Sequence, residues 1–295
     1  MIHRAVGLIA LALLVPLAGL SAQEASSGAP PVLDVTGTEY EFRTPATEIP
    51  AGWTTLDFEN RGEEAHEMVV GRVPEEGTYR ELRLFLGAVD TLQTRLDAGA
   101  IDSATYRKAL KKHSPAWLAD FEAGLTGVLP VSPGREVRMT VHLEPGIYQA
   151  ICFIPDSAGR PHWRRGMRTR IDVTGDSTGA RPPEADAAVT VAGYEIEAEG
   201  QPDRGTQTLA VRFSEPDSSG AESTPGIRLA RLEDGASVED VRSAGSLVEA
   251  PAEHLGGTLP TSPGSTVYLT VDLEPGHYVW LGPEEEGMSK TFTVP

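Results

Sequence analysis

Short runs in which every second residue is apolar recur along most of the chain. "TTLDFEN" (54–60), "EVRMTVHL" (136–143) and "YQAICFI" (148–154) alternate in this way, and Pro-Gly pairs at 133–134 and 145–146 mark turns. A period of two residues is typical of β-strands with one buried face. The pattern therefore predicts a mainly β protein.

One long segment, residues 74–125, departs from this alternation. Its apolar residues follow a spacing of three and four, which is the period of an amphipathic helix. Ser103 is a candidate N-cap for a second helix, and Ser114-Pro115 is a candidate start for a third. We expect a helical insertion here and a shorter one at 237–250. The apolar stripe consists of Leu82, Phe85, Leu86, Val89, Leu92 and Leu96.

An internal repeat divides the chain into two copies of one fold. "LPVSPGREVRMTVHLEPGIY" (129–148) and "LPTSPGSTVYLTVDLEPGHY" (259–278) agree at 13 of 20 positions with a constant offset of 130. Similarity over a whole hairpin-like unit indicates duplication. The Gly- and Pro-rich segment 174–187 reads as a linker. We expect domains at 32–175 and 186–295, each an antiparallel β-sandwich, the first with the helical insertion.

The N-terminus and the cysteine count indicate export. Residues 1–22 have a short basic start, an apolar run and small residues at Ser21 and Ala22, which is typical of a signal peptide. We therefore expect a periplasmic or secreted protein with no membrane span after signal removal. Cys152 is the only cysteine, so it cannot form an internal disulfide. It is a buried residue, a reactive thiol or a metal ligand.

Charge and motifs exclude several classes of function. The formal net charge is −18, which argues against nucleic acids and anionic membranes as partners. The sequence has no Gly-x-Ser-x-Gly elbow and no phosphate-binding glycine loop, and "HEMVV" lacks the second histidine of a zinc-protease helix. We expect a protein that is not an enzyme.

Two segments carry metal-ligand residue types. "IPAGWTTLDFENRGEEAHEMVV" places His66 at the end of a strand and turn, and "GIYQAICFIPDSAGRPHWRRGM" contains Cys152, His162 and Met167. In this order they resemble the cupredoxins, the blue type 1 copper proteins such as plastocyanin and azurin. The resemblance implies a Greek-key β-sandwich and one copper ion, with His66, Cys152 and His162 as trigonal ligands and Met167 as the weak axial ligand. A thiolate, two imidazoles and a thioether suit a Cu(I)/Cu(II) couple.

One spacing differs from the family pattern. Nine residues separate Cys152 from His162, which is more than in plastocyanin-like loops. The loop either folds back and presents His162 to the metal, because closure entropy grows slowly with loop length, or it holds His162 away. The sequence thus predicts a copper protein for electron transfer or copper holding, and the alternative is a metal-free cupredoxin-like binding module.

The second copy is a degenerate one. Gly282 aligns with Cys152, the segment that carries His162 is missing, Pro225 or Thr224 aligns with His66, and Met288 persists. We therefore expect no metal in the second copy.

Arginines cluster near the predicted site. The resemblance implies that a redox partner docks around the exposed histidine ligand, so a basic ring there predicts an acidic partner protein. The alternative is that these side chains are simply solvated. The arginines in question are Arg160, Arg164, Arg165 and Arg168.

Overall fold

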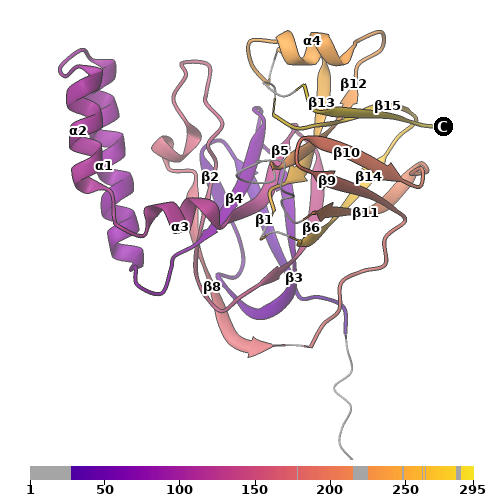
Figure 1. Cartoon of the computed structure of the whole chain (residues 1–295), viewed down its shortest axis with the longest axis horizontal. Helices are drawn as coiled ribbons and strands as arrows, with labels where there is room; N and C mark the ends of the chain where they lie inside the picture. Colours follow the sequence, from indigo (N-terminus) through magenta and orange to yellow (C-terminus); the bar gives the residue numbers. More distant parts are fainter. Residues whose placement is uncertain are drawn as a thin grey trace, which may run out of the picture.

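The computed structural model describes residues 28–177, 179–214, 225–247, 249–260, 262, 264–283 and 287–295. The predicted signal peptide, residues 1–22, lies outside the described residues. The fold is mainly β, as the alternating pattern predicts, and it contains two β-sandwich halves (Figure 1).

The first half consists of two packed sheets. One sheet has the order β2-β1-β3-β6 and the other has the order β8-β7-β4-β5. The long strand β3 pairs with β8 at its start and with β6 further on, so it contributes to both sheets. The strands are β1 (Val32–Thr38), β2 (Glu41–Arg43), β3 (Glu48–Asn60), β4 (His66–Arg72), β5 (Leu125–Val131), β6 (Glu136–Leu143), β7 (Gly146–Ile151) and β8 (Arg168–Ser177).

The second half repeats this plan. Its sheets have the orders β10-β9-β11-β14 and β13-β12-β15-β16. The predicted linker 174–187 overlaps the end of β8. The strands are β9 (Ala187–Ala192), β10 (Glu195–Glu199), β11 (Gly205–Phe213), β12 (Ile227–Leu232), β13 (Ala252–Thr258), β14 (Thr266–Leu273), β15 (Gly276–Leu281) and β16 (Ser289–Val294).

The two halves join edge to edge. β6 pairs with β14 in one sheet and β5 pairs with β13 in the other, both antiparallel. Met139 faces Leu269 and Val128 faces Thr258, and both pairs are related by the repeat offset of 130. The halves are therefore related by a pseudo-two-fold axis through these pairs. One apolar core runs across the seam and includes residues from both halves.

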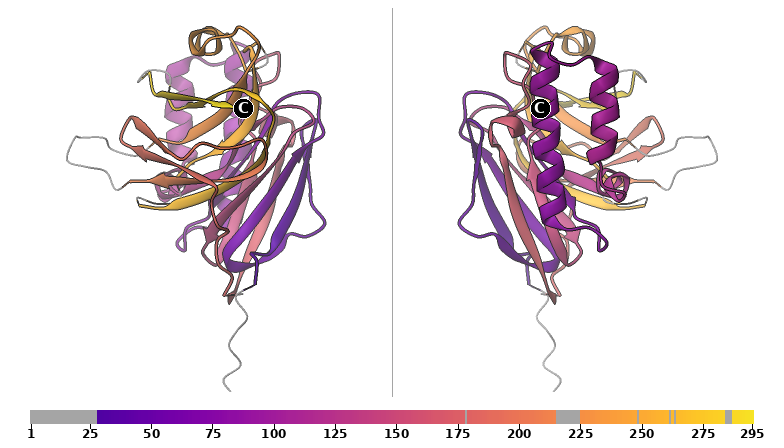
Figure 2. Two further views of the ribbon diagram at one scale, coloured as in Figure 1. Left: turned by 90° about the vertical axis from the view of Figure 1, so that its right-hand side faces the viewer. Right: turned by 90° about the vertical axis from the view of Figure 1, so that its left-hand side faces the viewer.

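Helices cover the first half on one side. α1 (Tyr79–Asp97) and α2 (Ser103–His113) form a hairpin beside the sandwich, and α3 (Leu118–Ala123) leads into β5 (Figures 1 and 2). Four residues of the predicted stripe, Leu82, Phe85, Leu86 and Leu92, are buried, and the other two, Val89 and Leu96, are half-buried.

The predicted helix starts differ slightly from the observed ones. Asp102, not Ser103, caps α2, because its carboxylate accepts the N–H of Thr105. The third helix begins at Leu118 rather than at Ser114. In the second half, Ser237 caps the short helix α4 (Val238–Ser243). Among the described residues, no helix is long and apolar enough to cross a membrane.

Candidate metal centre

Cys152 lies directly after β7, the strand between β4 and β8. The strand predicted at 148–154 ends at Ile151, and the Cys152 N–H donates to the carbonyl of Met167 at 3.2 Å. The Cys152 side chain is completely buried. Burial raises the pKa of its thiol to about 12, so the thiol is neutral unless a cation compensates the thiolate.

His66 begins β4, and the turn before it is held by buried Asn60. The Asn60 side chain donates to the carbonyls of Glu64 and Val131 and accepts the N–H of Gly62. A Cβ on residue 62 would lie 2.6 Å from His66 Nε2, so only glycine allows this approach. Burial lowers the pKa of His66 to about 4, which keeps its imidazole neutral and able to bind a metal.

The long segment between Cys152 and His162 folds back on itself. Residues 154–162 form a small hairpin: Pro155 pairs with Pro161, and the N–H of His162 donates to the carbonyl of Ile154 at 2.9 Å. Asp156 holds its turn by accepting the N–H groups of Ala158 and Arg160. The extra residues therefore close into a hairpin and return His162 to the side of Cys152.

Three donor atoms converge as a result. His162 Nδ1 lies 3.1 Å from His66 Nδ1 and 3.5 Å from Cys152 Sγ. The ligand atoms of these three residues lie within 4.8 Å of one another, and all three side chains are fully buried. His162 occupies the 3-10 turn η1 (His162–Arg165). Its pKa is lowered by burial, with an opposing influence from Glu64.

Met167 is joined to two of these residues through its backbone. Its carbonyl accepts the N–H of Cys152, and its own N–H donates to the carbonyl of His162 at 3.2 Å. Its side chain is fully buried, and a Cβ on Gly37 would lie 3.3 Å from its terminal methyl. The thioether is thus enclosed at the same end of the sandwich.

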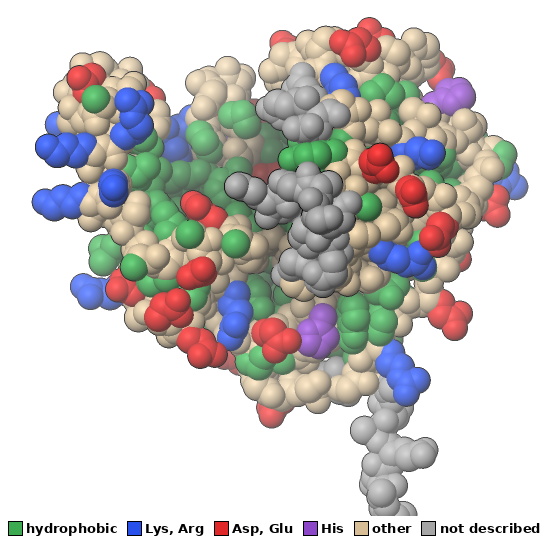
Figure 3. Space-filling view, viewed as in Figure 1, with side chains coloured by type: hydrophobic (Ala, Val, Ile, Leu, Met, Phe, Trp, Pro, Cys, Tyr) green, Lys and Arg blue, Asp and Glu red, His purple; other side chains and the backbone are tan. Residues whose placement is uncertain are grey.

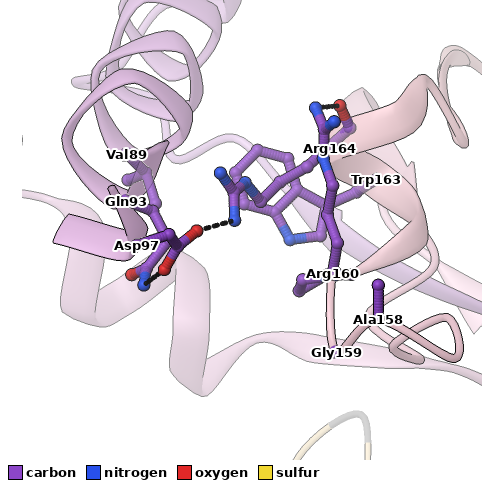
Figure 4. Close-up of a pocket in the computed structure, with 9 residues that line it drawn as sticks. Val89, Gln93, Asp97, Ala158, Gly159, Arg160, Trp163 and Arg164 are labelled. Carbon is purple, nitrogen blue, oxygen red and sulfur yellow. Dashed lines mark hydrogen bonds and ion pairs between the residues drawn. The ribbon is translucent and has the colours of Figure 1, made fainter. Parts of the chain in front are cut away.

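The helical insertion holds the returning loop. Arg164 bonds to three residues of α1, with Nε 2.7 Å from Asp90, Nη2 2.9 Å from Thr94 and Nη1 3.3 Å from Asp97. The Trp163 side chain packs into the apolar cluster of the helices. A cleft of about 350 Å³ separates α1 from the loop beside these contacts, and its walls include Gln93, Arg160 and Trp163 (Figure 4).

The predicted arginine ring is largely engaged within the protein. Arg164 bonds α1, Arg160 lies 3.7 Å from Asp90, and Arg165 pairs with Asp156. Arg160 and Arg165 remain partly exposed, at 44% and 38%. Further exposed basic side chains gather on the helical hairpin (left in Figure 3). On α2 these are Arg107, Lys108, Lys111 and Lys112.

In the described residues of the second half, the position that matches the thiol is filled by another side chain. The β15–β16 register matches Gly282 to Cys152 and Met288 to Met167. A Cβ on Gly282 would lie 2.3 Å from Met288 Sδ, so the methionine fills the space of the thiol. The register of β12 with β15 matches Pro225 to His66; Thr224 lies outside the described residues.

Sequence analysis did not identify three polar residues around the site. Glu64 Oε2 lies 2.8 Å from His162 Nε2, and the Tyr40 ring contacts His162 with centroids 5.0 Å apart. Glu67 is buried, accepts the N–H of Phe153 at 3.0 Å, and has its pKa raised to about 7 by burial. Only Glu67 carried a signal in the sequence, as a charge inside an apolar strand.

The donor set fits copper. One thiol and two imidazoles in a buried pocket form a site for a soft metal. A thioether is a ligand that copper accepts and zinc rarely uses. Copper binding requires loss of the Cys152 proton, whereas His66 is already neutral.

Comparison with known proteins adds structural similarity only. No protein-family model and no curated protein sequence matches the chain. A reduced auracyanin of Roseiflexus castenholzii is 21% identical over 50% of this chain and 99% of its own, with a TM-score of 0.28. Auracyanin A of Chloroflexus aurantiacus, a blue copper protein, is 19% identical over 50% of this chain and 100% of its own, with a TM-score of 0.30. A multicopper oxidase is 14% identical over 90% of this chain and 88% of its own, with a TM-score of 0.26.

Proposed function

We propose that this chain is an exported copper protein with one copper ion in its first half. His66 and His162 would hold the ion through Nδ1, Cys152 through its thiolate, and Met167 through its thioether. The observation that supports this proposal is the convergence of three buried donor atoms within 4.8 Å. Bound copper would supply a one-electron Cu(I)/Cu(II) couple.

The protein side chains prepare this site in three ways. The Asn60 turn and the hairpin at 154–162 hold the two imidazoles facing each other. Burial excludes water from the ligands, and it keeps His66 unprotonated. The same burial disfavours the free thiolate, so the metal must compensate the charge of Cys152.

We propose electron transfer rather than catalysis. His66, Cys152, His162 and Met167 are all fully buried, which leaves no evident position for a substrate. Copper holding is the second candidate. Glu64 and Tyr40 cover the edge of His162. In an electron-transfer protein that edge would face the redox partner.

A copper titration of the mature protein tests the metal site. We expect one equivalent of Cu(II) to give an intense thiolate-to-copper absorption band, and we expect Cys152→Ser to give none. No bound metal and an unchanged spectrum would support the metal-free binding module instead. If copper binds, reversible oxidation and reduction without loss of copper supports electron transfer. Release of copper on either oxidation or reduction supports copper holding.

Export and the redox partner are parts of this proposal. N-terminal sequencing of the protein from cell fractions tests cleavage after Ala22. We propose an acidic partner docked near Arg160, Arg165 and Arg168, with Arg164 fixed on α1 behind them. Salt-dependent electron exchange that weakens in Arg165→Ala tests that surface. A matched change on α2, Lys111→Ala, tests whether the exposed basic helix serves instead.

A further inference from the structure

Two side chains from separate turns meet on the outer edge of His162. Glu64 lies in the turn between β3 and β4, and Tyr40 lies in the two-residue turn between β1 and β2. Glu64 Oε2 is 2.8 Å from His162 Nε2, while the Tyr40 ring meets the imidazole edge to face at 67°. The Glu39 carboxylate accepts the N–H of Glu63 and so ties the two turns together.

We propose that Glu64 and Tyr40 are positioning residues for His162, which fix its tautomer and close its edge to solvent. This inference rests on the proposed copper site. Neither Glu64 nor Tyr40 is a copper ligand in that site. Both residues act on the site through the His162 imidazole, which they contact.

The Glu64 contact selects one form of the ring. A neutral imidazole carries one N–H, and the hydrogen bond made by the outer nitrogen decides which nitrogen keeps the lone pair. A carboxylate oxygen 2.8 Å from Nε2 favours the tautomer that carries its proton on Nε2, and the lone pair then lies on Nδ1. Nδ1 is also the atom that faces Cys152 Sγ at 3.5 Å and His66 Nδ1 at 3.1 Å. The other tautomer would direct a proton into the space between the three donors.

Tyr40 has a backbone conformation that tyrosine rarely adopts. Its φ is +65°, and it is the only residue other than glycine with positive φ in the part of the chain that the structure describes. Such strain persists only where the surroundings enforce it, and it concentrates at functional sites. Here the ring is fixed between the His162 edge and the Arg165 guanidinium, which lies 4.6 Å from the ring centre.

The second half provides an internal comparison. The strand registers match the turn Gly193-Tyr194 to Glu39-Tyr40. There the glycine takes the positive φ, +57°, and the Tyr194 side chain has no matching histidine and is 45% exposed. The fold therefore does not require a strained tyrosine in this turn. Among the described residues, the strained tyrosine occurs in the half that contains the three converging donors.

The Glu64 contact is tested first without metal. ¹⁵N chemical shifts of histidine-labelled apo protein report the tautomer of each ring. We expect His162 to be protonated on Nε2 in the wild type and to become a mixture of tautomers in Glu64→Ala, with Glu64→Gln intermediate. An Nδ1–H tautomer in the wild type, or an unchanged spectrum in Glu64→Ala, would overturn the role of Glu64. This measurement remains decisive even if the protein binds no copper.

Copper retention then tests both residues. We expect Glu64→Ala to lower copper affinity about 10- to 100-fold, the usual effect of removing the outer partner of a metal-bound histidine. Tyr40→Gly should speed removal of Cu(I) by a chelator about tenfold by the same reasoning, and Tyr40→Phe, which keeps the ring, should stay near the wild type. Tyr194→Gly is the matched control and should change nothing.

The melting temperature of the apo variants distinguishes a loss of positioning from a defect in folding. Glycine relieves the positive φ but removes a half-buried ring, and these effects oppose each other, so apo Tyr40→Gly should melt close to the wild type. Faster copper loss at unchanged melting temperature supports the closing role of Tyr40. Equal retention in Tyr40→Gly and Tyr194→Gly would refute it. Failure of the wild type to bind copper would instead refute the proposed function.

Discussion

Replacing Arg164 with methionine separates the helical insertion from the loop that carries His162. The Arg164 side chain is 6% exposed and bonds Asp90, Thr94 and Asp97 of α1. Methionine keeps most of the aliphatic stem and removes the guanidinium. The change therefore tests the bonds rather than the packing.

The expected loss of stability is intermediate. Hydrogen bonds to charged groups contribute about 1.5–3 kcal/mol each, but part of this is recovered when the abandoned partner returns to water. The Asp90 and Asp97 side chains are 38% and 54% exposed, so both can be rehydrated. We expect a net loss of about 2 kcal/mol, below the ~3–5 kcal/mol of a fully buried pair. For a protein of this size that lowers the Tm by about 4–8 °C.

Chemical denaturation of the apo protein measures this difference. Arg212→Met is the control, because Arg212 lies 2.7 Å from Glu199 but is 45% exposed. It should cost less than about 1 kcal/mol. A double-mutant cycle with Asp90→Asn isolates the coupling between Arg164 and Asp90. We also expect weaker copper binding in Arg164→Met, because His162 is two residues away on the same loop. Equal losses for both arginines, together with unchanged copper affinity, would refute the role of α1 as a brace.

Five further substitutions address the ligands and the pH dependence. Cys152→Ser should abolish the thiolate-to-copper band, because a hydroxyl does not replace a soft thiolate, whereas His113→Ala on the exposed end of α2 should leave it intact; loss of copper in the latter would mean that the wrong histidines are assigned. Met167→Leu should keep copper but shift its reduction potential, and Met288→Leu should shift nothing; equal effects measured by redox titration would contradict the axial assignment. His254 is buried with its pKa lowered to about 4, so the folded state stays neutral while the unfolded state gains a proton below about pH 6.5. Stability is then lost between pH 6.5 and 4, by up to about 3 kcal/mol, and His254→Leu should flatten that part of the unfolding profile relative to the wild type.

Much of the fold follows from local pattern. The alternation in "EVRMTVHL" predicts β6 at its observed bounds, and the three-four stripe predicts the buried face of α1. The repeat predicts a second sandwich without a thiol. Strand and helix periods are set by near neighbours in the chain, and a repeat is found by comparing two segments of the sequence. Both kinds of feature can therefore be read without the structure.

The order of the donors was also visible, but their convergence was not. The nine residues after Cys152 were compatible with a loop that presents His162 and with one that holds it away. The hairpin pairing of Pro155 with Pro161 decides between them, and Arg164 on α1 stabilises the result. The bond from Arg164 to Asp90 joins residues 74 positions apart, which no local pattern predicts.

The tertiary structure alone determined the surroundings of the site. Glu64 and Tyr40 look like ordinary turn residues in the sequence, and the arginines near His162 look like a free basic ring. In the fold, two distant turns meet on one imidazole, and acidic side chains of α1 and the loop engage three of the arginines. The sequence by itself determined which residue types are available and in which order, because strand and helix periods are local. Which of them touch is decided by packing between segments far apart in the chain, and no periodicity records those contacts.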